Sequence, residues 1–320
     1  MDQLSKQAMK YWPKLAEQMG IVGGAWQISP LAHRKDERVT MVALKLVGAD
    51  GRALVLKQQV KPVDPDGFAQ AMQGHMAAQE VFASGVPELF AVDLEAQACV
   101  MAFVSGAPLA TLLEDATIEE QAEIMRKAGQ WLGEFHQATL GAPRVFQPKY
   151  TLNYLREVIQ EVKDQKRQVI DPRRFLTCAE ALSGRQTLFE GRKTAGAQTH
   201  GDLHMRNVLV GESVHGIDFS ASREVPVGHD IGRLLSDYAI LRAPHHEIRP
   251  GEVIPILVRN AFFQGYGLVG PEDPSVQLLM RHRVLAEWWG LPAQQDQRSV
   301  AQEMRWQGIK SLSDKVFPGR

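Results

Sequence analysis

The chain has 320 residues, of which 44% are hydrophobic and 23% are charged, and its 36 lysines and arginines nearly balance 37 acidic residues to a formal net charge of −1. This length and apolar content are enough to bury one large core or two smaller ones. A net charge near zero creates no field that would attract nucleic acid or an anionic membrane surface, so we expect neither as a partner.

The two cysteines, Cys99 and Cys178, stand in apolar or helical segments and form no C-x-x-C pair. They are predicted to be buried thiols in a reducing cytoplasm. The first residues lack a basic patch followed by an apolar run, and no stretch approaches the roughly 20 apolar residues that span a bilayer. The sequence therefore predicts a cytoplasmic protein without a membrane segment.

The N-terminal third is predicted to be a short helix followed by an antiparallel sheet. Helical spacing of apolar residues runs over 4–19, with Pro13 as a position that divides the segment. Segments rich in β-branched and apolar residues then follow at 26–31, 39–47 and 53–60. Asp50-Gly51 between the last two segments is a hairpin signal, because glycine adopts the positive φ that tight turns require.

The third of these strands carries Lys57 among apolar neighbours, and a helix predicted over 68–83 carries Glu80. This arrangement is similar to the kinase strand lysine that holds nucleotide phosphates and the helix glutamate that orients it. Lys57 is therefore a predicted phosphate contact, with Glu80 as its partner. The alternatives are an outward-facing strand lysine and a glutamate on a solvated helix face.

Two apolar strands and a series of helices come next. Val86–Val92 reads as a turn into a strand, and Ala98–Leu109 as an apolar strand that ends in glycine and a proline turn. Thr117-Ile118-Glu119-Glu120 is a capping-box signature that opens a helix with an apolar stripe ending near His136, which we expect to be a packed or capping histidine. Amphipathic helices are predicted over 152–163 and 172–189.

A polar loop follows these helices. It has the sequence T-H-G-D-L-H-M-R-N from Thr199 to Asn207, and it runs into the apolar stretch Val208–Val210 before Ile217-Asp218-Phe219. In kinase-type phosphoryl transfer an Asp accepts the proton of the attacking hydroxyl, and an Asn five positions later binds magnesium. Asp202 and Asn207 have this spacing. Asp218, after the next short strand, is placed to supply a hard oxygen ligand to the metal.

Two other interpretations of this loop remain open. Asp202 and Asp218 could be ordinary turn residues, because aspartate favours turns through local hydrogen bonds. Alternatively, His200 and His204, with Asp202 between them, have the spacing of metal ligands in a hydrolase. That reading requires further ligands downstream, where His245-His246 is the only candidate.

The combination H-G-D-L-H-x-x-N and I-D-F resembles the aminoglycoside phosphotransferase family, which is itself similar to choline, homoserine and fructosamine kinases. The resemblance implies an α+β, two-lobed protein-kinase-like fold. Its nucleotide-binding N-lobe, a small antiparallel sheet, would comprise residues 1–104. Its larger, mainly helical C-lobe, with the catalytic and substrate sites, would comprise residues 105–320.

The same resemblance assigns further residues. Met101 would line the back of the adenine pocket, and the carbonyl of Ala102 and the amide of Val104 would face the base. Asp230 fits the family's aspartate that opens a helix and braces the catalytic loop. A protein kinase is disfavoured, because no A-P-E-like motif follows Asp218.

One departure concerns the nucleotide-covering loop, which is usually rich in glycine so that backbone amides can approach phosphates. Here the turn expected over 32–38 contains no glycine, although its Arg34, Lys35 and Arg38 could replace amides by charge. The alternative is that the same residues form a solvated turn. This departure suggests an alternative function, a non-catalytic nucleotide-binding regulatory module.

The leading prediction is a magnesium-dependent kinase that transfers the γ-phosphoryl group of ATP, with GTP as an open alternative donor, to the hydroxyl of a small molecule. Asp202 would be the base, and Asn207 and Asp218 would hold Mg²⁺. The sequence leaves the acceptor and the oligomeric state open.

A neutral or anionic acceptor is nevertheless predicted in preference to a polycationic aminoglycoside, because charges after Asp218 are nearly balanced. A short basic run would suit an anionic acceptor, but its residues could also be solvated surface charges, and folding could still gather scattered carboxylates into one pocket. The basic residues are Arg242, His245, His246 and Arg249, and the carboxylates are Asp237, Glu287 and Asp296.

Overall fold

The computed structural model describes residues 1–35, 39–221 and 223–317. The chain forms two compact units. The first unit comprises Met1–Gly106 and Gly211–Ala221, and the second comprises Ala107–Val210 and the described residues after 222. Segment 211–221 therefore groups with the first unit, although it falls within the range 105–320 that is predicted from the sequence for the C-terminal lobe.

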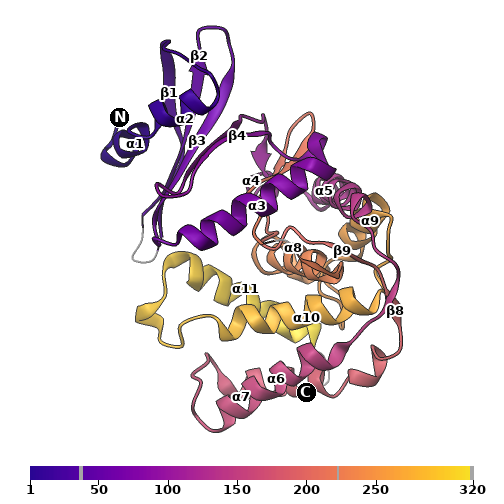
Figure 1. The fold of residues 1–320 in the computed structure, drawn as a ribbon. Coiled ribbons are helices and arrows are strands. Elements are labelled where there is room, and N and C mark those ends of the chain that lie inside the picture. The colour runs from indigo at the N-terminus through magenta and orange to yellow at the C-terminus, as the bar shows by residue number, and fades with distance from the viewer. Residues whose placement is uncertain (36–38, 222, 318–320) are drawn as a thin grey trace. The chain divides into compact units, whose positions relative to one another are not determined.

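The first unit is built on a five-stranded sheet with strand order β1-β2-β3-β5-β4, in which every neighbouring pair is antiparallel (Figure 1). Its strands are β1 (Trp26–Lys35), β2 (Thr40–Gly48), β3 (Ala53–Lys61), β4 (Leu89–Asp93) and β5 (Ala98–Ala102), and its other elements are α1 (Gln3–Met9), α2 (Trp12–Gln18), α3 (Pro65–Val81), η1 (Ala83–Gly85) and β11 (Val214–Gly216). The predicted antiparallel sheet is thus confirmed.

Helices lie against both faces of this sheet. Leu15 of α2 packs with Leu44, Leu54 and Leu56 on one face, and Phe68 of α3 packs with Cys99 and Met101 on the other. Because side chains alternate along a strand, Lys57 projects on the α3 face, directly opposite Cys99 in register. The predicted burial of Cys99 and Cys178 is confirmed.

Local signals explain most element boundaries in the first unit. The predicted lead-in helix is divided as expected, since Pro13 lies in the first turn of α2. Gly51 takes a φ of 82° in the β2–β3 hairpin, a value that glycine adopts without strain. Helix α3 begins three residues before its predicted start, because the side chain of Asp64 accepts a hydrogen bond from the Gly67 amide at 2.9 Å and caps it.

The turn predicted over 32–38 differs from the observed structure. β1 continues to Lys35, so residues 32–35 belong to a strand that pairs with β2. In the register of this pair, His33 lies opposite Val42 and Arg34 lies opposite Met41. Arg38 and its two preceding residues lie outside the described part of the chain.

The second unit is mainly helical (Figure 1). Its helices are α4 (Leu109–Leu112), α5 (Ile118–Ala138), α6 (Pro148–Lys163), α7 (Pro172–Ser183), α8 (Gly228–Leu241), α9 (Ile256–Tyr266), α10 (Pro274–Trp289) and α11 (Val300–Val316), with 3₁₀ turns η2 (Gln186–Leu188), η3 (His245–Glu247) and η4 (Gln295–Gln297). Three short antiparallel pairs join β6 (Ala107–Pro108) to β10 (Val208–Val210), β7 (Arg144–Val145) to β8 (Lys193–Thr194), and β9 (Gly196–Gln198) to β12 (Glu224–Pro226).

Helix α5 is the central helix of this unit. The predicted capping box is confirmed: Thr117 accepts from the Glu120 amide at 3.3 Å, and Glu120 accepts from the Thr117 amide at 2.8 Å. Helix α9 packs so closely on α5 that a Cβ at Gly133 would collide with the carbonyl of Tyr266. This close approach brings the Tyr266 hydroxyl within 2.9 Å of His136 Nδ1.

Candidate active site

The catalytic-loop motif lies between β9 and β10 in the second unit. Leu203 and Met205 are buried, which anchors the loop in the core, and the intervening Asp202 and His204 remain partly exposed. The Asn207 amide donates to the His204 carbonyl at 2.9 Å and closes the turn before β10. The sequence pattern of alternating polar and apolar residues thus presents Asp202 at the surface of a fixed loop.

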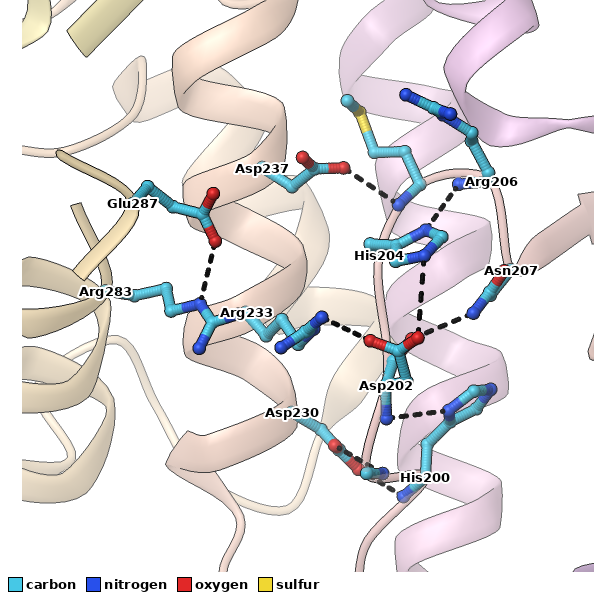
Figure 2. Close-up of polar contacts among 12 residues, drawn as sticks. His200, Asp202, His204, Arg206, Asn207, Asp230, Arg233, Asp237, Arg283 and Glu287 are labelled. Atoms are coloured by element: carbon cyan, nitrogen blue, oxygen red, sulfur yellow. Dashed lines mark hydrogen bonds and ion pairs between the residues drawn. The ribbon is translucent and has the colours of Figure 1, made fainter. Parts of the chain in front are cut away.

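Asp202 has two cationic or polar neighbours (Figure 2). Its Oδ1 forms an ion pair with Arg233 of α8, and its Oδ2 lies 3.8 Å from Nε2 of His204. Burial lowers the pKa of His204 below its ordinary value of 6.5, although the Asp202 carboxylate opposes this shift. Asp202 Oδ2 therefore has no strong partner among the described residues and can accept a proton from a ligand hydroxyl.

Asn207 is buried, and its side chain is held by the same loop. Its Nδ2 donates to the Asp202 backbone carbonyl at 2.9 Å. In this orientation the carboxamide oxygen makes no hydrogen bond within the described structure. An uncharged oxygen on a fixed side chain is a suitable ligand for magnesium, so the residue present fits its predicted role.

Asp230, in the first turn of α8, holds the start of the loop through hydrogen bonds to its backbone. Its Oδ2 accepts the His200 amide at 2.7 Å, and its Oδ1 accepts the Gly201 amide at 3.3 Å. His136 Nε2 lies 3.2 Å from Oδ2, so Asp230 also connects the loop to α5. Burial raises the pKa of Asp230, but the hydrogen bonds and nearby histidines outweigh this and leave it below 3.8. The complete burial of His136 agrees with its predicted packing role.

We expect Asp230→Asn to lower the free energy of unfolding by about 2–4 kcal/mol, because an amide NH₂ would face donors that the carboxylate now accepts. The loss should be largest above pH 4: a carboxyl with a lowered folded pKa stabilises the native state above its unfolded pKa and loses that contribution as pH falls. Urea unfolding at pH 7 and pH 3 measures it, with the exposed Asp296→Asn as control. Equal losses at both pH values would contradict this account.

In the first unit, Lys57 and Asp218 are brought together although they are far apart in sequence. The Lys57 ammonium forms an ion pair with Asp218 Oδ1, and both side chains remain partly exposed. Asp218 has a φ of 61°, a left-handed conformation that aspartate tolerates better than most residues. Non-glycine residues held in this region occur preferentially at functional sites. The pair therefore offers a cation for phosphates and a carboxylate for a metal.

The printed ion pair of Lys57 is with Asp218, and the predicted pairing of Lys57 with Glu80 stays a prediction. Glu80 is exposed near the C-terminal end of α3 and lines a cavity of about 660 Å³ with Gln18 and Phe90. The residue of α3 that faces the Asp218 segment is His75, whose buried ring contacts Phe219 edge-on at 5.6 Å. His75 Nε2 lies 2.7 Å from the Pro87 carbonyl, which fixes the ring.

The predicted adenine-pocket residues lie at the end of β5. Met101 is buried beside Phe68, and the Ala102 amide donates to the Glu88 carbonyl at 2.8 Å. The Phe103 amide donates to Ala53, whereas the Val104 amide makes no hydrogen bond to a described residue. This pattern is compatible with a base bonded to Val104, and the assignment stays a prediction.

The basic run predicted to meet an anionic acceptor has other contacts. Arg242 donates to the Ala110 carbonyl at 3.0 Å, and His245 lies 2.7 Å from the Ala239 carbonyl. Neither residue lines the cavity next to Asp202. That cavity has a volume of about 220 Å³, and its lining is His204, Arg206, Arg233, Asp237, Glu287 and Arg305.

Arg233 is a residue of the site that was not predicted from the sequence. A signal for it was present, because it lies three positions after Asp230 and therefore about one helical turn along α8 on the same side. Arg283 and Arg305 have no such local signal, since they come from α10 and α11, and only the fold brings them near the loop.

The metal-hydrolase alternative lacks its ligand set. His200 is completely buried, and its Nδ1 accepts the Asp202 amide at 3.3 Å. Within residues 1–35, 39–221 and 223–317, no three His, Cys, Asp or Glu side chains are arranged to hold a metal ion. Magnesium in nucleotide enzymes needs no such cluster, because waters and phosphates supply most of its ligands.

No helix in the described structure has both the length and the apolar character that a membrane crossing requires.

No curated protein matches the sequence. Solved structures do match, and three examples share the fold over most of their length. A putative fructosamine-3-kinase from Thermobifida fusca is 19% identical, with a TM-score of 0.55 over 95% of this chain and 98% of that one. A macrolide 2'-phosphotransferase from Brachybacterium faecium is 15% identical, with a TM-score of 0.56 over 96% of this chain and 99% of that one. A glucosamine kinase in complex with glucosamine, ADP and phosphate is 14% identical, with a TM-score of 0.56 over 90% of this chain and 80% of that one.

These likenesses confirm the predicted protein-kinase-like α+β fold. At such low identities they say nothing of the substrate. Residues 44–279, most of the sequence, match the Phosphotransferase enzyme family (APH). The chain that carries the H-G-D-L-H-x-x-N loop therefore belongs to this phosphotransferase family.

Proposed function

We propose that this protein is a magnesium-dependent kinase that transfers the γ-phosphoryl group of ATP to a hydroxyl of a small molecule. The observation that carries the proposal is the catalytic loop of a phosphotransferase-family chain, in which Asp202 presents a carboxylate oxygen to solvent and Asn207 is fixed to the same loop. The structural relatives with kinase activity in their names support a small-molecule acceptor.

The roles of the residues follow from their chemistry. Asp202 Oδ2 would orient the acceptor hydroxyl and take its proton as the new O–P bond forms. The Asp230 brace would hold Asp202 in place, and most of the rate enhancement would come from such positioning. Lys57 would bind the nucleotide phosphates.

Bound magnesium would neutralise phosphate charge in the transition state. The Asn207 carboxamide oxygen and the Asp218 carboxylate are the residues that would hold it. Both fit the hard-oxygen chemistry that this ion prefers. Phosphate transfer to an acceptor would leave ADP, with the Asp202 proton released to solvent.

The proposal is tested by incubating the protein with γ-labelled ATP, magnesium and a panel of small alcohols, sugars and amino sugars. We expect label in at least one acceptor, and none when magnesium is chelated or when Asp202 is replaced by Asn. Parallel reactions with GTP identify the donor. Nucleotide binding without transfer to any acceptor would instead favour the regulatory-module alternative.

The two partners suggested by the sequence, Lys57 and Glu80, are expected to behave differently. Lys57→Met should lower kcat/KM for ATP by about 100-fold or more, because a phosphate-binding cation is lost. Glu80→Gln should change it by less than about twofold, because Glu80 is exposed and pairs with no described residue. Steady-state kinetics with varied ATP measures both. A large effect of Glu80→Gln would show that α3 rotates toward Lys57 in the working enzyme.

A further inference from the structure

The structure of the second unit suggests the chemical class of the acceptor. We propose that the acceptor carries a small oxyanion, a carboxylate or a phosphate, which binds the guanidinium groups of Arg233 and Arg283 next to Asp202. The inference rests on the proposed function, because it concerns the substrate of the same site. It is carried by an arginine cluster, defined here as Arg206, Arg233, Arg283 and Arg305.

Three members of the cluster line a small cavity beside the candidate base, and the fourth, Arg283, pairs with Glu287 of its lining. Arg206, Arg233 and Arg305 line its volume of about 220 Å³. Pockets for drug-sized ligands have about 300–1,000 Å³. The part of the acceptor that the second unit holds is therefore small, unlike a multi-ring aminoglycoside.

The carboxylates near this cavity are already neutralised. Arg305 donates to Asp237 at 2.9 Å and to Glu287 at 3.0 Å. Asp237 also accepts the Met205 amide at 3.1 Å, which ties it to the catalytic loop. Asp237 and Glu287, two of the carboxylates that could have formed a cation site, do come together, but both form ion pairs with Arg305. An ammonium group on the acceptor would have to displace that arginine.

Arg283 and Arg233, in contrast, lack sufficient acceptors. Figure 2 shows Arg283 extending from α10 toward Arg233 on α8. Arg283 makes one ion pair, from Nε to Glu287 at 3.2 Å, and its terminal amino groups donate to no described residue. Arg233 pairs with Asp202, while its Nε is buried without a hydrogen-bond acceptor in the described structure.

The two guanidinium groups also repel each other. Burial, and next the charge of Arg233, hold the pKa of Arg283 below its ordinary value of 12.5. An oxyanion between two forks of N–H donors removes this repulsion and supplies the missing acceptors. With four arginines and three carboxylates, Asp202, Asp237 and Glu287, the site has an excess of positive charge before any ligand binds.

The anion site can be tested without knowing the acceptor. Inorganic phosphate is titrated into the isotope-labelled protein, and the Nε–Hε signals of arginines are followed by NMR, with assignments from Arg233→Lys and Arg283→Lys. We expect the Arg233 and Arg283 signals to shift saturably. The matched control is Arg259 of α9, which already pairs with Glu252 at 2.7 Å and should not move. Absence of shifts at Arg233 and Arg283, or equal shifts at Arg259, overturns the site.

Pairs of acceptors that differ only in their anionic group test whether the anion site contributes to catalysis. We expect kcat/KM for glycerate to exceed that for glycerol, and Arg283→Gln to reduce this ratio by about 10- to 100-fold, the effect of one charge-assisted contact. Transfer to kanamycin or glycerol that exceeds transfer to glycerate would refute the inference and leave the kinase proposal intact. Phosphate-induced shifts without transfer to any acceptor would refute the kinase proposal and leave the anion site intact.

Discussion

Replacing Asp202 by asparagine is expected to lower kcat for phosphoryl transfer by at least about 100-fold, with nucleotide affinity changed by less than about twofold. An amide has nearly the shape of the carboxylate but cannot take the proton of the attacking hydroxyl. Because Asp202 lies on a loop whose amides at His200 and Gly201 are held by Asp230, the substitution should leave the loop in place.

The measurement is single-turnover transfer from labelled ATP, combined with calorimetric titration of a non-hydrolysable ATP analogue. Asp296→Asn is the matched control, because it makes the same chemical change at an exposed position of η4. If Asp202→Asn retains full turnover, Asp202 has no part in proton transfer. If nucleotide affinity falls in parallel with turnover, the substitution has disturbed the nucleotide site rather than the base.

The position of the candidate catalytic loop could be predicted because its polar residues are close together in the sequence, whereas their catalytic roles stay predictions. Asp202 and Asn207 lie five positions apart on one turn-rich segment, so the spacing alone indicates that they act together. The same holds for the capping box at Thr117, where one turn of helix determines the contact. Such local features require no knowledge of the tertiary fold.

The partner of Lys57 could not be predicted in this way. His75 and Glu80 are both on α3, but five residues turn a helix by about 140° beyond one full rotation, so the two side chains face different surroundings. A polar helix without a strong apolar stripe does not reveal which face is buried, and α3 buries Phe68, Gly74, His75 and Ala78. The ion pair of Lys57 with Asp218 depends on packing of segments 161 residues apart.

The arginine cluster illustrates the same limit on the acceptor side. The expectation of an anionic acceptor came from Arg242 and His245, which instead hold backbone carbonyls. The residues that now support it, Arg233 and Arg283, are on two helices separated by α9 in sequence. A linear count of charges could not distinguish a guanidinium that holds the chain together from one that faces a cavity.

Asp218→Asn is expected to remove most of the magnesium dependence of nucleotide binding, and to lower kcat by about 100-fold or more. Asparagine is the informative replacement, because it tolerates the left-handed backbone at this position, whereas alanine would add backbone strain to the loss of charge. The change removes a full negative charge next to Lys57. Nucleotide binding without magnesium should therefore weaken little or even improve, because the freed ammonium can approach the phosphates.

The difference between the effects on nucleotide binding with and without magnesium distinguishes a metal ligand from a structural carboxylate. Calorimetric titration of the ATP analogue with and without magnesium gives the ratio of the two affinities, which we expect to be at least about tenfold in the native protein and close to one in Asp218→Asn. Loss of a residue that only supports the fold would weaken binding equally in both conditions. Equal affinity with and without magnesium in the native protein would exclude Asp218 as the residue through which the metal assists nucleotide binding.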